Sequence, residues 1–399
     1  MEYQDEPFPA LIEKRVDGEP DISARERAVL EACRRKNLGD LRMLAETPGG
    51  FVTDRVRQRA WPVLLGLPTD TEASLDAPTW KELPRHRDED QVKLDVNRAF
   101  IYYPQHQNDA ELERQKDELS SLILEVLRRY PYLCYFQGYH DICQVLLLVL
   151  PPVLRAPAVA RLSALRIRDF MLPSLTPAIS QLRLIPDILR AADPALYRHL
   201  SSTEPFFALS GTLTMYAHDI TTLGEISRLF DVLLAREPVF SVYMFAAIVR
   251  SRRDELFDTP RDEPEMLHSI LSKLPRPLDL ESLIAAAMAL IDAHPPEKLQ
   301  SWRSISKASV LKTARDADRC TAQSMADGER FFRRQLRELA WLERQDKILA
   351  ELWRYRRPAG AVGIAVLVGV VAVLLRRPGA AWAGGPLAYV SALLVRLGR

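Results

Sequence analysis

Residues 135–141 read Tyr-Phe-Gln-Gly-Tyr-His-Asp and lead directly into Ile-Cys-Gln-Val-Leu-Leu-Leu-Val-Leu at 142–150. The run from Asp141 to Leu150 is apolar nearly all round, which predicts a buried helix that ends at the prolines 151–152. Gln137 stands just before a glycine and this helix. The predicted fold therefore has a buried helix at its centre, and a side-chain amide is presented where that helix begins.

A second motif lies upstream, where residues 92–98 read Val-Lys-Leu-Asp-Val-Asn-Arg. A helix over 92–102 would place Asp95 and Arg98, three residues apart, on one face of a single turn. An arginine and a glutamine presented together are what a phosphoryl-transfer site needs from outside, because the guanidinium neutralises developing charge and the amide orients the attacking water. Either motif alone indicates little, whereas the pair in this order is a strong indication.

Most of the chain has the periodicity of amphipathic or buried helices. Helices are expected at 23–44 with a break near Asn37, from Asp54 to Gly66, and at 92–102, 119–130, 141–150, 157–171, 179–190, 206–219, 223–236, 238–255, 264–273 and 280–293, the last capped by Asp279. Residues 67–88 are expected to form a loop. Few segments alternate with a period of two residues, and no series of turn-bounded strands occurs. The sequence therefore predicts an all-α fold.

The bulk composition excludes several classes of function. The chain has 399 residues with 54 basic and 53 acidic side chains, so its net charge of +1 gives no indication of a nucleic-acid partner. Its four cysteines are scattered, which fits a reducing compartment, and neither they nor the histidines show the spacing of metal ligands. The acidic N-terminus lacks the apolar run of a secretory signal peptide. There is no Walker loop, so we expect no nucleotide site in this chain.

The strongest hydrophobic feature is residues 358–375, which contain no charged or polar side chain and lie between Arg-Arg pairs at 356–357 and 376–377. As a helix this segment would extend about 27 Å at about 1.5 Å per residue, enough to cross a thin bilayer of the endoplasmic-reticulum kind. Arginines at both ends suit lipid headgroups. We therefore expect a transmembrane anchor at 358–375, with the preceding residues in the cytosol.

The segments that flank this anchor allow alternatives. Residues 299–357 are strongly charged with leucines at helical spacing, which predicts a juxtamembrane helical segment or a solvated helix packed on the preceding domain. Residues 376–399 form a short tail whose apolar stretch, 379–395, could return through the membrane, lie in the interface or sit in the lumen. Arginines flank every boundary, so the positive-inside rule does not decide between these topologies.

Four motifs in order resemble those of TBC domains, the GTPase-activating domains for Rab GTPases. Residues 57–66, Arg-Gln-Arg-Ala-Trp-Pro-Val-Leu-Leu-Gly, resemble the opening motif, and Val92-x-x-Asp95-x-x-Arg98 resembles the arginine-finger motif. Residues 135–138 resemble the glutamine-finger motif, and residues 228–234, Arg-Leu-Phe-Asp-Val-Leu-Leu, resemble a helix of the C-terminal half. The resemblance covers roughly residues 46–298 and implies an N-terminal arm and helix at 1–45, followed by a TBC domain at 46–298.

The resemblance also implies roles for individual residues. Arg98 would be the arginine finger and Gln137 the glutamine finger, both supplied in trans to the Rab. The supporting residues would be Asp95, Arg57, Tyr135, Gly138 and Asp141. Asp95 would hold the Arg98 region or Arg57, Arg57 would pair with an acidic residue beneath the site, and the others would shape the loop and the start of the helix. His140 is interpreted as structural, because this reaction needs no general base from the activator.

Residues 94–98, 137–142 and 207–210, together with the hydrophobic tail, are most similar to the membrane-anchored subgroup of TBC domains. That similarity implies a GTPase activator at the endoplasmic-reticulum membrane, with the Golgi as a further location, acting on a GTP-bound Rab of ER-to-Golgi traffic. GTP and Mg²⁺ would belong to the Rab, and the chain would have no cofactor or metal of its own. The alternative is a catalytically silent, membrane-anchored Rab-binding scaffold, against which the presence of both fingers argues.

Overall fold

The computed structural model describes residues 22–67, 79–104 and 108–375, with side chains described within 24–351 and at Val368 and Gly369. Every regular element in these ranges is helical, and no strand occurs there. The predicted all-α fold is therefore confirmed. The expected arm at 1–20 and the second apolar stretch at 379–395 lie outside the described residues.

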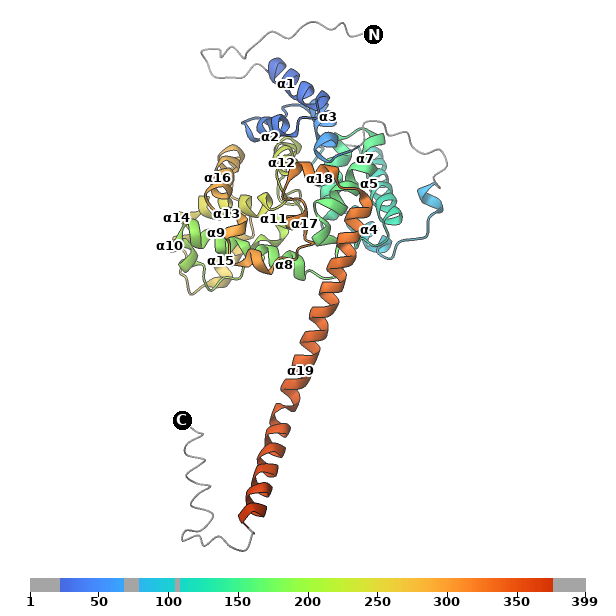
Figure 1. The fold of residues 1–399 in the computed structure, drawn as a ribbon. Helices are drawn as coiled ribbons and strands as arrows, with labels where there is room; N and C mark the ends of the chain where they lie inside the picture. The colour runs from blue at the N-terminus through green and yellow to red at the C-terminus, as the bar shows by residue number, and fades with distance from the viewer. Residues whose placement is uncertain (1–21, 68–78, 105–107, 376–399) are drawn as a thin grey trace. The chain divides into compact units, whose positions relative to one another are not determined.

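The elements of the first half of the fold are α1 (Ile22–Arg34), α2 (Leu38–Glu46), α3 (Asp54–Leu64), η1 (Trp80–Glu82), α4 (Glu89–Val96), α5 (Asp109–Arg129), α6 (Tyr139–Val149), α7 (Pro152–Leu165), η2 (Arg168–Met171), α8 (Thr176–Leu182), α9 (Leu184–Ala192) and α10 (Pro194–His199). They include α3, α4, α5 and α7, which all pack against α6. Helix α5 also packs against α4 and α7, and α4, α5 and α7 are labelled in Figure 1. Nearly all of α6 is buried, as its sequence predicts.

The second half continues the same helical body. Its elements are η3 (Pro205–Ala208), α11 (Leu209–Leu213), α12 (Leu223–Ala235), α13 (Phe240–Ser251), α14 (Arg253–Phe257), α15 (Pro264–Leu271), α16 (Leu280–Ala293), η4 (Pro296–Lys298), η5 (Ser301–Ser304), α17 (Val310–Thr313), α18 (Ala317–Ala322) and α19 (Met325–Leu375). Helix α13 packs against α16 and α9, while α12 contacts α2, α3 and α6. The two halves thus share α6 and α12 as their common core.

Side-chain caps set several of the helix starts. The carboxylate of Asp279 accepts a hydrogen bond from the Ser282 N–H at 3.1 Å, so α16 begins where the sequence predicts. Asn108 caps α5 in the same way. Helix α3 differs slightly from expectation, because Thr53 occupies the N-cap and Asp54 is the first helical residue.

Several predicted helices are shorter than expected or divided, and two of them border the groove described below. The helix predicted at 92–102 ends at Val96, because Phe100 adopts a left-handed backbone with φ of 63°. The helix predicted at 206–219 is reduced to η3 and α11, since Met215 and Tyr216 have φ of 49° and 66°. In both places the chain leaves the helix to form a wall of the groove described below.

The chain divides after Leu336 into two units. In the first, residues beyond 298 still contribute to the core: Trp302, Val310 and Leu311 are buried, as are Phe332 and Gln335 at the start of α19. The segment that follows the expected domain boundary therefore packs onto the domain up to this point. The boundaries drawn from the sequence, between the TBC domain and the segments around it, remain predictions.

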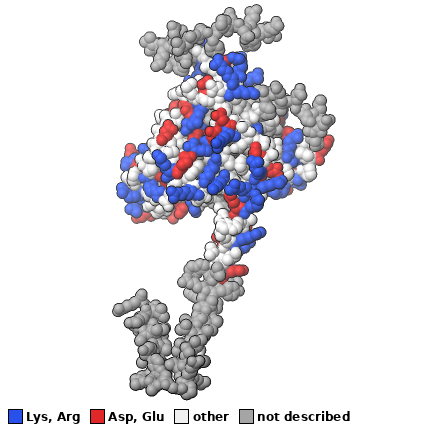
Figure 2. All heavy atoms as spheres, in the orientation of Figure 1, with Lys and Arg blue, Asp and Glu red and all other residues white. Residues whose placement is uncertain are grey.

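The second unit begins within α19, where Trp341, Leu342, Ile348 and Leu349 are exposed. In the part of the chain that the structure describes, no helix combines the length and the apolar character needed to cross a membrane. The predicted anchor at 358–375 falls within α19, but apart from Val368 and Gly369 its side chains lie outside the described residues. On the face seen in Figure 2, basic and acidic side chains are interspersed.

Candidate functional site

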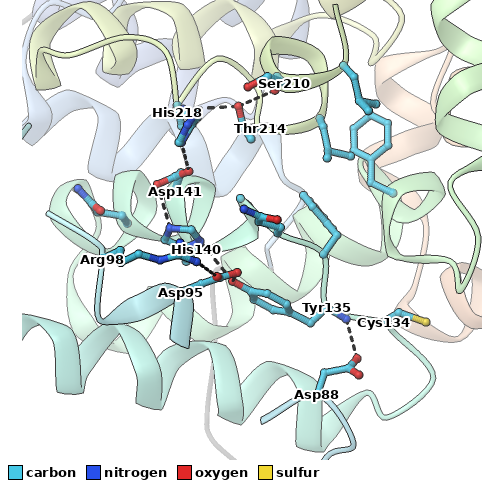
Figure 3. A pocket seen from close by; sticks show the side chains of 18 of the residues that line it. Asp88, Asp95, Arg98, Cys134, Tyr135, His140, Asp141, Ser210, Thr214 and His218 are labelled. Atoms are coloured by element: carbon cyan, nitrogen blue, oxygen red, sulfur yellow. Dashed lines mark hydrogen bonds and ion pairs between the residues drawn. The ribbon is translucent and has the colours of Figure 1, made fainter. Parts of the chain in front are cut away.

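The two sequence motifs meet at one open groove of about 960 Å³. Its walls come from five segments: residues 87–88, the end of α4 with the loop 97–104, the loop 134–138 with the first half of α6, residues 170–175, and residues 209–218. Both Arg98 and Gln137 line it (the labelled part of the site is shown in Figure 3). The structure thus brings to one groove the arginine and the glutamine that the sequence places in two separate motifs.

Arg98 is an exposed cation that is paired with a buried carboxylate. It lies in the turn after α4, where its N–H donates to the Asp95 carbonyl at 3.0 Å. Its Nη2 donates to Asp95 Oδ1 at 2.7 Å, while its side chain remains 65% exposed and that of Asp95 is fully buried. Among the described residues, Asp95 is the one ion-pair partner of Arg98. Asp95 therefore orients the guanidinium from the protein interior, and the solvent-facing side of the guanidinium is accessible to a partner.

Asp95 receives two further hydrogen bonds. Gln91 Nε2 donates to Oδ1 at 3.1 Å, and the Tyr135 hydroxyl donates to Oδ2 at 2.9 Å. Burying a carboxylate is costly unless it is paired and hydrogen-bonded, so these donors make the buried position tolerable. Asp95 holds Arg98 and not Arg57, which decides between the two arrangements expected from the sequence.

Tyr135 connects α4 to the loop that carries Gln137. Its backbone N–H donates to Asp88 Oδ2 at 2.9 Å near the start of α4, and its hydroxyl reaches Asp95 near the end (Figure 3). Burial raises the pKa of the Tyr135 phenol, so the hydroxyl stays protonated and can donate to Asp95. Because one residue contacts both ends of α4, the loop 135–138 cannot slide along that helix without breaking these bonds.

Gln137 is exposed at the rim of the groove, and its side chain has no hydrogen-bond partner among the residues described. Gly138 follows with φ of 95°, a left-handed conformation that L-residues rarely adopt, and forms the N-cap of α6. A Cβ atom at Gly138 would lie 2.6 Å from Thr214 Cγ2. A glycine is required here both by the backbone conformation and by the neighbouring segment.

A chain of polar contacts continues from Tyr135 across the start of α6. The Tyr135 hydroxyl lies 3.2 Å from His140 Nδ1, and His140 Nε2 lies 3.3 Å from Asp141 Oδ1. Asp141 Oδ2 lies 3.0 Å from Nδ1 of His218 (Figure 3). Burial lowers the pKa of His140, whereas the hydrogen bond with Asp141 raises the pKa of His218. The two imidazoles that flank one carboxylate therefore differ in their tendency to carry charge.

The loop 97–104 is fixed to α6 by Gln144. The Gln144 side chain accepts from the Phe100 N–H at 3.1 Å and donates to the Tyr103 carbonyl at 3.1 Å. These bonds stabilise the left-handed backbone at Phe100 that ends the helical turns behind Arg98. Next to them, Ile101 and Tyr102 are exposed on the groove wall.

Arg57 lies in a separate cluster. Its Nε and Nη2 donate to Asp231 at 3.0 and 3.1 Å, and its Nη1 donates to Asp54 at 2.9 Å. Asp231 is fully buried and also accepts from Trp61 Nε1 and the Phe51 N–H. The acidic partner expected for Arg57 is thus Asp231. None of these residues lines the groove, but α3 and α12, which carry the pair, both pack on α6.

The chemical groups of the site suit a protein that acts on atoms held by another molecule. In the described residues, no group of three or more His, Cys, Asp or Glu is arranged to hold a metal ion. The exposed groups along the groove include the Arg98 guanidinium and the Gln137 amide, which can stabilise and orient reacting atoms held by another molecule. That the chain uses no cofactor of its own remains a prediction.

Comparison with known proteins identifies the family. Residues 54–257 match the RabGAP-TBC family, described as the Rab-GTPase-TBC domain, which is about half of the chain. The chain belongs to the RabGAP-TBC family. The resemblance inferred from its motifs is therefore confirmed.

Relatives of this RabGAP-TBC chain extend the match. It is 35% identical over 295 residues to "GTPase-activating protein gyp10" of Schizosaccharomyces pombe, covering 73% of this chain and 78% of that protein. It is 30% identical over 350 residues to "TBC1 domain family member 20" of Homo sapiens, covering 86% of each. The crystal structure of the Ypt/Rab-GAP domain of Gyp1p shares the fold, with a TM-score of 0.53 at 17% identity over 67% of this chain and 98% of that one.

Several groove residues of this RabGAP-TBC domain were missed by sequence reasoning. Asp88 stands at the start of α4, where a helix-capping residue would be expected, and this signal could have singled it out. Gln144 is a polar residue within the otherwise apolar run 142–150, which is a second usable signal. His218 contacts Asp141 from 77 residues away, and no local pattern identifies it.

Proposed function

We propose that the chain accelerates GTP hydrolysis by a Rab GTPase, with Arg98 and Gln137 entering the Rab's nucleotide site in trans. The observation that carries this proposal is the pairing of an exposed guanidinium with a fully buried carboxylate, beside an exposed amide at the same groove. Family membership supports the reaction class. GTP and Mg²⁺ are the substrate and metal of the Rab.

The two side chains have distinct roles in this mechanism. Arg98 neutralises the charge that develops on the transferred γ-phosphoryl group, for which its rigid fork of N–H donors is suited. Gln137 orients the attacking water through its amide. Neither residue needs to gain or lose a proton, so the chain provides positioning and electrostatic stabilisation only.

Preorganisation of the fingers makes such catalysis efficient. Arg98 is held by Asp95, and the Gln137 loop is held by Tyr135, which bonds to the same Asp95. Because both fingers share one fixed carboxylate, less conformational freedom is lost when the Rab binds. A surface arginine without such a carboxylate partner would lose more side-chain entropy on docking.

The substrate is a Rab of ER-to-Golgi traffic in its GTP-bound form, and the chain is held at the endoplasmic-reticulum membrane by residues 358–375. This part of the proposal is supported by the uncharged sequence of the segment, by its flanking arginine pairs and by the resemblance of residues 94–98, 137–142 and 207–210 to the membrane-anchored subgroup of TBC domains. The groove then acts on the cytosolic side, where Rab GTPases are found.

Single-turnover GTP hydrolysis tests the activity. The full chain in detergent is mixed with a panel of GTP-loaded Rabs, beside Arg98→Ala and Gln137→Ala. An arginine finger is worth about 10³–10⁵ in rate, so Arg98→Ala should lose nearly all acceleration, and Arg98→Lys should recover little because a point charge cannot replace the fork. Arg114→Ala is the matched control, since Arg114 is 60% exposed and pairs with Glu111 three residues away, outside the groove.

The outcomes separate the activator from the scaffold. Acceleration of particular Rabs by the wild type and by Arg114→Ala, lost in both finger variants, supports the proposal. Acceleration that survives Arg98→Ala refutes the role of the arginine. Binding of a Rab without acceleration by the wild type would identify a Rab-binding scaffold instead.

The membrane anchor is tested separately. The full chain expressed in cells should resist carbonate extraction, and deletion of 358–399 should release it. An N-glycosylation acceptor appended after Arg399 should be modified if the tail lies in the lumen and should stay unmodified if 379–395 returns to the cytosolic side. Full release of the intact chain by carbonate contradicts the anchor.

A further inference from the structure

The carboxylate of Asp141 is held between two imidazoles from different segments. His140, its neighbour on α6, approaches Oδ1 at 3.3 Å, and His218 approaches Oδ2 at 3.0 Å (Figure 3). Asp141 lies in the first turn of α6, three residues after Gly138 and four after Gln137. Its N–H also donates to the Gly138 carbonyl at 3.1 Å. A displacement of this carboxylate would therefore also displace the turn that presents Gln137.

The segment that carries His218 is itself firmly placed. Two consecutive residues, Met215 and Tyr216, have left-handed backbones, a conformation that persists only where the surroundings enforce it. The Tyr216 ring is buried and its hydroxyl donates to the Ser241 carbonyl at 2.7 Å. The Tyr103 hydroxyl donates to the Ala217 carbonyl at 3.3 Å. His218 is thus presented from a fixed point of the fold.

The segment that carries His218 also contacts the loop that carries Gln137, through Thr214. Thr214 Cγ2 lies where a side chain on Gly138 would begin, 2.6 Å from an ideal Cβ position. The Thr214 hydroxyl donates to the Ser210 carbonyl at 2.9 Å, which fixes the direction of this methyl group. Residues 214–218 therefore contact both the turn before α6, through Thr214, and the first turn of α6, through His218.

We infer that His218 is a positioning residue for Gln137: by holding Asp141 it fixes the first turn of α6 and, with it, the loop that presents the amide. This inference rests on the proposed function, in which Gln137 orients the attacking water. His218 does not touch the reacting atoms in this scheme. It acts through Asp141, whose N–H donates to the Gly138 carbonyl in the turn that presents Gln137.

The exposure of His218 separates this role from a general contribution to folding. Its side chain is 60% exposed, and exposed ion pairs contribute little to stability. Loss of this imidazole should therefore leave the fold intact. The reaction is more sensitive, because a displacement of about 1 Å in a positioned group can cost up to about 10² in rate.

The charges around His218 predict a pH dependence. The charged and titratable groups that act on it are Asp141 and His140 on α6 and Asp219 in its own segment, and Tyr103 from the loop 97–104 bonds to the carbonyl of the neighbouring Ala217. The hydrogen bond with Asp141 raises the pKa of His218, so the imidazolium persists above the ordinary histidine range. A charge-assisted bond is stronger than a neutral one. The charge-assisted hydrogen bond from His218 to Asp141 is therefore fully formed below this raised pKa and weakens as the pH rises through it.

The test uses the full chain in single-turnover hydrolysis at increasing activator concentration, which separates the maximal rate from half-saturation. His218→Ala should lower the maximal rate about tenfold with little change in half-saturation, because positioning is lost and docking is not. His218→Asn should recover most of the rate, since an amide N–H can donate to Asp141 from the same position. In His218→Asn, the decline of the wild-type rate with rising pH, normalised to intrinsic Rab hydrolysis, should be absent.

Matched controls isolate the effect. His294→Ala removes a histidine at the end of α16, outside the groove, and should change nothing. In a Gln137→Ala background, His218→Ala should add no further loss, because the amide it positions is gone. Unfolding midpoints of the His218 variants should stay within about 2 °C of wild type.

Hydrogen exchange gives a readout that does not depend on activity. Amides of 135–141 should exchange faster in His218→Ala than in the wild type or His218→Asn. Faster exchange in a chain that activates no Rab would refute the proposed function while the positioning of the loop stands. Unchanged exchange and an unchanged maximal rate in His218→Ala would overturn the inference, as would a loss that His218→Asn fails to recover.

Discussion

Replacing Gly138 with alanine tests two separable reasons for a glycine at the start of α6. The first is the backbone, since φ of 95° is disfavoured for an L-residue by about 1–2 kcal/mol. The second is steric, because the new Cβ would lie 2.6 Å from Thr214 Cγ2. Thr214 is buried and its hydroxyl is bonded to the Ser210 carbonyl, so its methyl group cannot simply rotate away.

A second substitution separates the two effects. Thr214→Ser keeps the hydroxyl and removes the methyl group, at a cost of about 1 kcal/mol for the lost buried carbon. Overpacking typically costs about 1–3 kcal/mol, so Gly138→Ala should destabilise the fold by about 2–5 kcal/mol in total. The double variant should regain the steric part and keep the backbone part. Its free energy of unfolding should therefore exceed what the sum of the two single losses predicts.

Two assays read this coupling. Thermal unfolding of the full chain reports stability, and single-turnover Rab hydrolysis reports the placement of Gln137. We expect Gly138→Ala to lower the rate more than tenfold, and Gly138→Ala/Thr214→Ser to be faster than Gly138→Ala while remaining slower than the wild type. Strict additivity of the two substitutions would refute the steric contact. Full activity in Gly138→Ala would refute the need for a fixed turn at Gln137.

Two further substitutions probe the support of the site. Arg57→Ala leaves Asp231 as a buried carboxylate without its ion-pair partner, so the free energy of unfolding should fall by about 3–5 kcal/mol, whereas Arg57→Ala/Asp231→Asn should recover part of the unfolding midpoint, because it removes the buried charge and keeps an oxygen that can accept from Trp61 Nε1. Gln144→Leu removes both hydrogen bonds to the loop 97–104 and should lower the maximal hydrolysis rate about tenfold. Gln58→Leu, which loses a bond to a carbonyl outside the groove, is its control and should retain the rate.

The sequence predicted those parts of the fold that depend on local signals. Helix α16 runs from the predicted cap at Asp279 to a stop just before the prolines 295–296, because capping and proline act within a few residues. The buried helix α6 was predicted from its apolar run alone. The pairing of Asp95 with Arg98 was also within reach, since three residues separate them and the turn continues past the end of α4.

The rest depends on contacts between distant segments. Asn97, Arg98 and Ala99 are compatible with a helix, and the helix nevertheless ends at Val96 because Gln144 holds the Phe100 backbone in a left-handed conformation. Tertiary contacts override local propensity in such places. The break after α11 has the same origin, since burial of the Tyr216 ring favours a backbone that its sequence does not encode.

The hydrogen bonds to Asp95 bear on how Arg98 could leave this carboxylate for a phosphoryl group. Its buried carboxylate accepts from Arg98, from Gln91 and from Tyr135, so its charge is shared among one cationic and two neutral donors. If the guanidinium moves toward a phosphoryl group during the proposed reaction, the carboxylate still keeps two hydrogen bonds. A buried anion with no other donor would instead resist that movement, because stripping it of its last partner is strongly unfavourable. Tyr135, which holds the Gln137 loop in place, therefore also helps to make Arg98 available to the substrate.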